Sequence, residues 1–372
     1  MSKAAELAAL IGSQTALSNR NIIINGAMQV AQRGTSAVAA GAGTYPSLDR
    51  FKAWESSDGA FTVEQSTTAP AGFTTSLKAQ VTTADTSLSA AQYAQLSQQI
   101  EAQNLQHLSY GTNDAKTITL SFHVRSSKTG SYSITIYKDD TTRYLFSKSY
   151  TIDSANTWEK KSITIAPDSN IKASGGAIAN DNGLGFYVFW NLAGGTNFDD
   201  ATDNAWSSNT SHFHTSSQVN WMDSTSNNFY LTGVQLEVGE QATAFEHRSF
   251  GDELARCQRY YVRDSATYSG GSSAYKFFAS GNCVSTTSSR FTYHFPVPMR
   301  TAPTLGQSAN STLAVYAAAG IGAFSADAAI NSPNNLSTGL TTTLAAGQTA
   351  GQGASLIANN DTAAFLEFIA EL

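Results

Sequence analysis

The stretch YLTGVQLEVGEQATAFEHRSFGDELARCQRYY, residues 230–261, decides the organisation of the chain, because it joins a predicted β-strand to a predicted helix. The strand ends at Val238. The helix covers residues 249–263, where Ser249 can cap the first turn and Asp252 completes a pair similar to a capping box. This junction, residues 248–263, links an upstream β-region, residues 19–247, to a second region, residues 264–372.

One face of the predicted helix is apolar. Its residues recur at spacings of four, three and four, which places them on one stripe: Phe250, Leu254, Cys257 and Tyr261. We expect this stripe to pack against a domain or a neighbouring subunit. The two cysteines, Cys257 and Cys283, are too few for a disulfide scaffold, and Cys257 is expected to be a buried free thiol.

The upstream region, residues 19–247, is predicted to be an antiparallel β-sandwich of the jelly-roll type. Residues 117–125, TITLSFHVR, alternate cleanly, so that Ile118, Leu120, Phe122 and Val124 face one side. Residues 185–191, GFYVFWN, are continuously apolar, as expected of a central strand. Residues 22–24 form a short β-branched run that ends at the turn dipeptide Asn25-Gly26. Strands at this spacing, separated by Gly, Asn, Asp and Ser, favour a sandwich.

Residues 264–372 are predicted to form a second β-rich domain, a β-sandwich at the tip of the protein. Strands are expected at residues 276–284, 290–297 and 313–317. No charged residue lies between Asp327 and Asp361, a composition also typical of disorder, but regularly spaced Ile, Leu and Phe residues favour short strands. The closing AAFLEFIAEL is expected to be a strand with Leu366 and Phe368 on the same face.

The first 18 residues are predicted to contain a short amphipathic helix. Leu7, Leu10 and Ile11 lie at helical spacing, but a helix this short is marginal alone in water. Its apolar stripe therefore needs a partner, either copies of itself or another protein, and we interpret it as an anchor. The alternative is a frayed tail.

Composition excludes several classes of protein. Only 13% of the 372 residues are charged and the net charge is −6, without a cluster of Lys and Arg, which argues against a nucleic-acid partner. No apolar run is long enough to span a membrane, and the first residues do not resemble a secretory signal. We expect a mainly β-protein that is made in a cytoplasm.

Several stretches, taken in order, resemble bacteriophage tail-fibre proteins that carry a jelly roll like that of carbohydrate-binding modules. NIIINGAMQVAQRGTS (21–36) is similar to the opening strand, and YPSLDRF (45–51) and NTWEKKSITI (156–165) to internal strands. The stretch quoted first is similar to the exit and linking helix. HFPVPMRTAPTL (294–305), with the terminal AEL, is similar to the tip domain. The resemblance implies a virion protein, usually a homotrimer and often receptor-facing.

Residues 191–220 are the predicted glycan-binding segment, because aromatic side chains there alternate with carboxylates and amides in a long loop. Sugar-binding sandwiches stack a sugar ring on an exposed aromatic face and use nearby polar groups for the hydroxyls. The candidates are Trp206, Trp221, Phe213, Asp199 and Asn204. The alternative is that the two tryptophans belong to the core.

Metal binding and catalysis have less support. Asp199, Asp200 and Asp203 could bind Ca²⁺, although a solvated acidic loop is the favoured interpretation and no cofactor is expected. His212 and His214 lack an evident third ligand. No catalytic motif of the hydrolase, zinc-protease or phosphate-loop type is present, so we expect a protein that is not an enzyme.

Three functions follow from the sequence. The first is a phage tail fibre or tail-tip adhesin that contacts host-surface polysaccharide and resides in the virion tail. The second is a purely structural capsid decoration or head-fibre protein. The third is a polysaccharide depolymerase, for which a pair of carboxylates flanking a cleft is needed.

Overall fold

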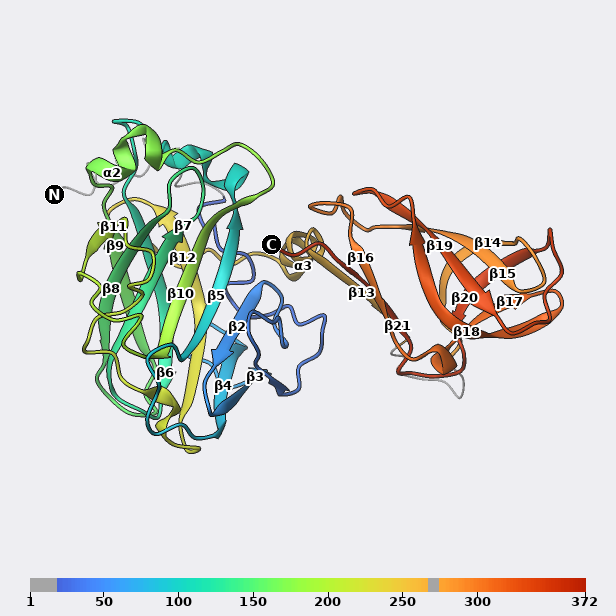
Figure 1. The fold of residues 1–372 in the computed structure, drawn as a ribbon, viewed down its shortest axis with the longest axis horizontal. Helices are drawn as coiled ribbons and strands as arrows, with labels where there is room; N and C mark the ends of the chain where they lie inside the picture. The colour runs from blue at the N-terminus through green and yellow to red at the C-terminus, as the bar shows by residue number, and fades with distance from the viewer. Residues whose placement is uncertain (1–18, 267–273) are drawn as a thin grey trace. The chain divides into compact units, whose positions relative to one another are not determined.

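A computed structural model describes residues 19–266 and 274–372 of the protein. The chain divides between Glu253 and Leu254 into two compact units, with Leu372 assigned to the first (Figure 1). The predicted anchoring helix with Leu7, Leu10 and Ile11 lies outside the described residues. Among the described residues, no helix is both long enough and apolar enough to cross a membrane.

The N-terminal unit is a sandwich of two antiparallel six-stranded sheets, as predicted (Figure 1). The first sheet has the order β1 (Val38–Ala39), β3 (Ala60–Ser66), β4 (Ser76–Thr83), β12 (Asn228–Val238), β6 (Ile118–Ser126), β9 (Glu159–Ile165). The second sheet has the order β11 (Ala205–Ser207), β8 (Tyr144–Ile152), β7 (Gly130–Lys138), β10 (Leu184–Gly194), β5 (Tyr93–Glu101), β2 (Phe51–Ser56). Short helical segments are η2 (Ala102–Leu108), α2 (Ser169–Lys172), η3 (Ser174–Gly176) and η4 (Trp221–Asp223).

One large hydrophobic core holds the two sheets together. The predicted inward face of β6 is confirmed, since Ile118, Leu120, Phe122 and Val124 are fully buried. The apolar stretch at residues 185–191 forms most of β10, which lies between β7 and β5 in the middle of its sheet. Its inward-facing residues Phe186, Val188 and Trp190 are fully buried in the core.

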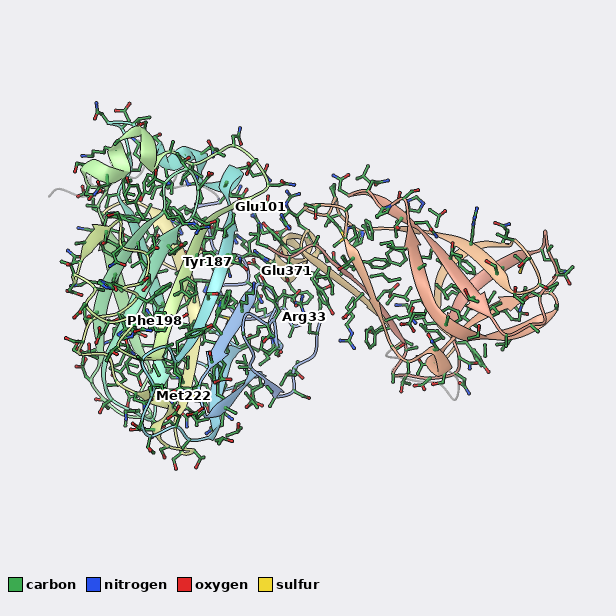
Figure 2. All side chains as sticks on the ribbon, in the orientation of Figure 1. Arg33, Glu101, Tyr187, Phe198, Met222 and Glu371 are labelled. Atoms are coloured by element: carbon green, nitrogen blue, oxygen red, sulfur yellow. The ribbon has the colours of Figure 1, made fainter. Side chains whose placement is uncertain are left out.

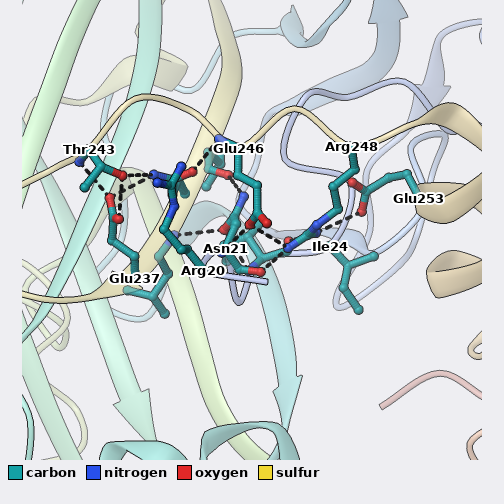
Figure 3. Close-up of polar contacts among 12 residues, drawn as sticks. Arg20, Asn21, Ile24, Glu237, Thr243, Glu246, Arg248 and Glu253 are labelled. Carbon is teal, nitrogen blue, oxygen red and sulfur yellow. Dashed lines mark hydrogen bonds and ion pairs between the residues drawn. The ribbon is translucent and has the colours of Figure 1, made fainter. Parts of the chain in front are cut away.

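The opening segment differs from the prediction. Residues 22–24 do not form a strand; they belong to a turn in which Asn25 has a φ of 61°. This segment is fixed by side chains from residues 246–253, at the C-terminal end of the unit's sequence (Figure 3). Glu246 accepts a hydrogen bond from the backbone N–H of Asn21 at 2.7 Å, and Glu253 accepts one from that of Asn25 at 2.6 Å. Arg248 donates to backbone carbonyl oxygens of the same segment. Side-chain hydrogen bonds therefore replace a strand ladder here.

The linking helix α3 (Phe250–Gln258) begins where the sequence predicts, because the backbone N–H of Asp252 donates to Ser249 Oγ at 3.2 Å. It ends earlier than predicted. Tyr261 starts a strand, β13 (Tyr261–Ser265), and so does not belong to the helical stripe. Adjacent aromatic and β-branched residues favour this extended backbone. Of the predicted stripe, Cys257 is buried, whereas Phe250 is 56% exposed.

The C-terminal unit contains a three-stranded sheet and a closed antiparallel barrel. The sheet has the order β13, β21 (Phe365–Ile369), β16 (Thr304–Gln307). The barrel has the order β14 (Phe277–Cys283), β15 (Ser288–His294), β19 (Ser337–Leu344), β18 (Gly320–Asn331), β17 (Leu313–Ala317), β20 (Gly353–Ala358), and η5 (Asn310–Thr312) precedes β17. The unit is thus β-rich, as predicted, and its larger sheet closes on itself because β20 pairs with both β14 and β17.

Two predictions about the C-terminal unit are confirmed. The segment after Ala318, which has no charged residue between Asp327 and Asp361, forms β18, β19 and β20. Leu366 and Phe368 of β21 are fully buried on the same face of their strand.

Candidate functional site

The outward face of the second sheet in the N-terminal unit carries an unusual number of aromatic rings. On β10, Phe186, Val188 and Trp190 point into the core and are fully buried. The alternate residues Tyr187 and Phe189 therefore lie on the opposite face. Strand pairing then places rings from other strands beside them, since Tyr187 is opposite Tyr137 of β7.

A loop brings further rings to this face. Phe198 and Phe213 belong to the segment that follows β10, and Phe213 contacts both Phe189 and Tyr137. The carbonyl oxygen of Phe213 is held by the sheet: it accepts hydrogen bonds from Ser147 Oγ at 2.8 Å and from Asn191 Nδ2 at 3.2 Å. The loop therefore has a defined position over the strands rather than a free one.

Sheet and loop together form an open cleft of about 340 Å³. Its lining residues are Trp54, Tyr93, Gln95, Tyr137, Asp139, Arg143, Tyr187, Phe189, Phe198, Thr210 and Phe213. The seven rings form one connected cluster, in which Trp54 lies 6.2 Å from Phe189 and Tyr93 lies 5.4 Å from Phe198, measured between centroids. Figure 2 labels Tyr187 and Phe198, which represent the strand and loop sides of the cluster.

Most of these rings are neither fully buried nor fully exposed. Trp54, Tyr137 and Tyr187 are half-buried. The indole N–H of Trp54 donates to Ser97 Oγ at 2.8 Å, which fixes the ring, and the Lys52 ammonium lies 4.8 Å from its centroid. A fixed, partly exposed ring offers a ligand a flat apolar surface at little entropic cost.

Several polar groups also line the cleft. Asp139 and Arg143 form an ion pair at 2.8 Å, and Gln95 donates to Asn191 Oδ1 at 2.8 Å. Burial raises the pKa of the Tyr187 hydroxyl, and the Asp139 carboxylate acts in the same direction. A side-chain hydrogen bond with Gln99 acts in the opposite direction. The cleft combines apolar area with a few placed polar groups, as small-molecule sites do.

Of the predicted glycan-binding residues, Phe213 lies in this cleft and the two tryptophans do not. Trp206 on β11 is 8% exposed, packs on Phe146, and donates from Nε1 to the carbonyl oxygen of Ala166 at 3.0 Å. Trp221 is 0% exposed and packs on Phe61. Neither indole presents a ring face to a ligand. We therefore correct the candidate set by removing both, which belong to the core.

The predicted polar partners lie outside the cleft lining as well. Asn204 has a φ of 62° and its backbone N–H donates to the carbonyl oxygen of Ser147 at 2.7 Å, so it shapes the turn before β11. Asp199 is half-buried, and its negative charge acts on the neighbouring imidazole of His214. Both residues belong to the loop that carries Phe213, and neither lines the cleft.

The acidic loop and the two histidines do not assemble a metal site. Asp203 accepts hydrogen bonds from Lys148 Nζ and from the backbone N–H of Ser149, both at 2.6 Å. Burial alone raises the pKa of Asp203, but these hydrogen bonds outweigh it and lower the pKa below its ordinary value. His214 is buried, whereas His212 is half-buried beside Asn209. Within residues 19–266 and 274–372, no three His, Cys, Asp or Glu side chains gather as metal ligands.

Five of the aromatic cleft residues were not identified as site candidates by the sequence analysis: Trp54, Tyr93, Tyr137, Tyr187 and Phe189. A signal for them exists in residues 185–191. There, aromatic residues occupy both alternating positions of the strand, so one set must lie outside the core. An aromatic outer face on a sandwich strand is itself a sign of binding.

No family model matches the chain, and no curated protein matches it. Solved structures with low similarity include carbohydrate-binding modules and a phage tailspike domain. A sugar-binding protein from Bacteroides thetaiotaomicron has a TM-score of 0.32 and 12% identity, over 59% of this chain and all of the other. The family 11 carbohydrate-binding module of a cellulosomal cellulase from Clostridium thermocellum has a TM-score of 0.28 and 9% identity, over 57% of this chain and 98% of the module.

The enzymatically active domain of tailspike protein 4 from bacteriophage CBA120 has a TM-score of 0.29 and 11% identity, over 59% of this chain and 21% of the tailspike chain. Similarity this low carries no argument about what the present chain binds. What the chain binds has to be inferred from the residues of its own cleft.

Proposed function

We propose that the N-terminal unit binds a polysaccharide in the aromatic cleft. The observation that carries the proposal is the connected cluster of seven rings around a cleft of about 340 Å³. The C–H groups of a pyranose ring are polarised and pack on the face of an aromatic ring, while its hydroxyl groups need hydrogen-bond partners at the rim. Tyr187 and the Asp139–Arg143 pair supply such partners.

The same cleft favours binding over hydrolysis. Glycoside hydrolysis generally uses two carboxyl groups on either side of the scissile bond. Among the described residues that line the cleft, Asp139 is the one carboxylate, and it is paired with Arg143. We therefore propose a binding protein rather than a depolymerase.

We further propose that this binding serves attachment of a phage virion to host-surface polysaccharide, with the chain located in the tail. Support comes from the ordered resemblance of five stretches to tail-fibre proteins, and homotrimerisation is part of the same proposal. Three weak glycan sites held together on a repetitive surface bind far more tightly than one, which is the physical advantage of that assembly.

The binding proposal is tested by exposing the intact oligomer to an array of bacterial and plant polysaccharides. The expected result is saturable binding to one class of glycan, with dissociation constants for short oligosaccharides in the micromolar to millimolar range. A blank array together with absence of binding to host cells contradicts the proposal.

The location is tested separately by electron microscopy of intact particles that carry a label on the C-terminus of this chain. Label at the outer end of the tail agrees with an adhesin. Label distributed over the capsid shell identifies a decoration protein and contradicts the attachment proposal.

A further inference from the structure

The outer wall of the C-terminal barrel carries a second hollow, distinct from the aromatic cleft. Along β15, the buried residues alternate with Arg290 and Thr292, which face outward. Strand register places Asn282 and Thr341 on either side of Arg290. In the next row, Gly339 lies between Thr292 and Asn331.

Gly339 lines the hollow and has no side chain, while its neighbours in the row, Thr292 and Asn331, both carry polar side chains. The cavity measures about 440 Å³ and is lined by Arg290, Asn282, Thr292, Asn331 and Thr341. A Cβ atom built on Gly339 lies 3.3 Å from the backbone carbonyl oxygen of Asn331, a tight contact that requires that carbonyl group to shift by a few tenths of an ångström. The lining is therefore polar and carries one positive charge.

Several of these polar groups have no partner within the described part of the chain. Asn331 Nδ2 donates to Thr341 Oγ1, which orients the amide and leaves its carbonyl oxygen without a partner. The Arg290 guanidinium, the Asn282 amide and the Thr292 hydroxyl make no hydrogen bond or ion pair to described residues. Grouped donors and acceptors around one cavity, with a guanidinium among them, are complementary to a polar anion.

We propose that this hollow binds an anionic sugar, namely a saccharide unit that carries a carboxylate or a phosphate group. The planar guanidinium of Arg290 pairs with two oxygens of such a group at once. Asn282, Asn331 and Thr292 then meet the sugar hydroxyls. A cavity of about 440 Å³ falls in the range of small-ligand sites. This hollow lies in a different unit from the aromatic cleft and has a different ligand chemistry. A negative binding result at one of the two sites therefore does not contradict the proposal for the other.

The experiment titrates the intact protein with D-glucuronate, glucose 6-phosphate, glucose and inorganic phosphate, using saturation-transfer NMR. Binding of glucuronate, glucose 6-phosphate or both, with glucose at least about tenfold weaker, is the expected result. Preference for glucuronate identifies a carboxylate ligand, and preference for glucose 6-phosphate identifies a phosphate ligand. Inorganic phosphate that binds as tightly as glucose 6-phosphate indicates anion attraction without sugar recognition and overturns the proposal, as does absence of binding by both charged sugars.

Two variants localise the effect. Arg290→Gln keeps an exposed polar residue on the barrel wall, so folding is preserved, and it should weaken binding of the charged sugars about tenfold. Gly339→Ala adds a methyl group at the wall of the hollow without removing any charge and should weaken binding as well. Thr343→Ala, on the same outward face of β19 but outside the hollow, is the matched control and should leave binding unchanged. Equal effects of all three variants, or none from Arg290→Gln, contradict the assignment.

Discussion

The rings of Tyr137 and Phe213 lie parallel, with 5° between their planes and 6.1 Å between their centroids. Tyr137 comes from β7 and Phe213 from the loop after β10, so a sheet and a loop contribute one continuous aromatic surface. Of the candidate residues predicted in that loop, Phe213 is the one that lines the cleft.

Replacement of Phe213 should weaken glycan binding with little effect on the fold. Phe213→Ala removes a half-buried ring from the cleft wall while the backbone carbonyl oxygen still accepts its hydrogen bonds from Ser147 and Asn191. We expect the dissociation constant for the array-identified glycan to rise about tenfold. Calorimetric titration checks this, and an unchanged constant would show that the ligand does not reach the loop side of the cleft.

Replacement of Trp221 should act on stability instead. Its indole is fully buried against Phe61, and truncation to Ala leaves a cavity in the core. We expect Trp221→Ala to lower the free energy of unfolding by about 3–5 kcal/mol. Urea denaturation measures the loss. The folded variant should still bind glycan with an affinity close to that of the wild type. A large loss of affinity without loss of stability would show that Trp221 belongs to the binding site.

Arg248 should be among the most sensitive charged residues of the N-terminal unit. Its side chain is 7% exposed, lies 3.5 Å from Glu253 and donates to the carbonyl oxygen of Ile23 (Figure 3). Removing one partner of a buried ion pair leaves the other charge uncompensated, which costs about 3 kcal/mol. Arg248→Ala should therefore destabilise the unit strongly. Lys161→Ala, at a more exposed ion pair with Glu159, is the control and should change stability by less than about 1 kcal/mol.

Acid should destabilise the loop through His214, the buried neighbour of Phe213. Burial lowers the pKa of His214 below its ordinary value of 6.5, although its hydrogen bond with the Thr215 carbonyl and the charge of Asp199 oppose the shift. The unfolded chain then binds a proton more readily than the folded one. The free energy of unfolding should fall as pH drops below 6.5 towards the pKa of the folded state.

His214→Gln isolates this contribution, because His107 and His123, whose pKa values are also lowered by burial, remain in the variant. The fall in stability between about pH 7.5 and pH 5.5 should be smaller in the variant than in the wild type. Denaturation curves at both pH values give the comparison, and identical pH dependence would rule out His214 as a contributor.

The local sequence pattern was sufficient to predict a strand and its buried face wherever one face of the strand is buried and the other is not. The alternation in β6 and β21 is an example, and so is the capped start of α3 at Ser249. The end of α3 was not predictable from helical spacing. Tyr261 satisfies the spacing, yet it belongs to β13 and pairs with Ile369 of β21. Pairing with a strand more than a hundred residues away decides that position.

Most of the cleft residues could not be predicted from the sequence for the same reason. Tyr137, Tyr187 and Trp54 lie on three strands far apart in the chain, and strand register brings them together. Composition suggested the loop after β10 instead, where Trp206 is prominent but turns into the core. A cluster made by sheet pairing has no contiguous sequence signature.

We propose that glycan binds on the aromatic face formed around Tyr187. The most direct measurement is a calorimetric titration of the array-identified oligosaccharide into the wild type, Tyr187→Ala and Trp158→Ala. Trp158 is a half-buried indole that packs on Tyr230 outside the cleft, so its variant controls for general loss of aromatic surface. We predict that Tyr187→Ala weakens binding at least about tenfold while Trp158→Ala binds as the wild type does. Equal affinities for all three proteins would contradict the account.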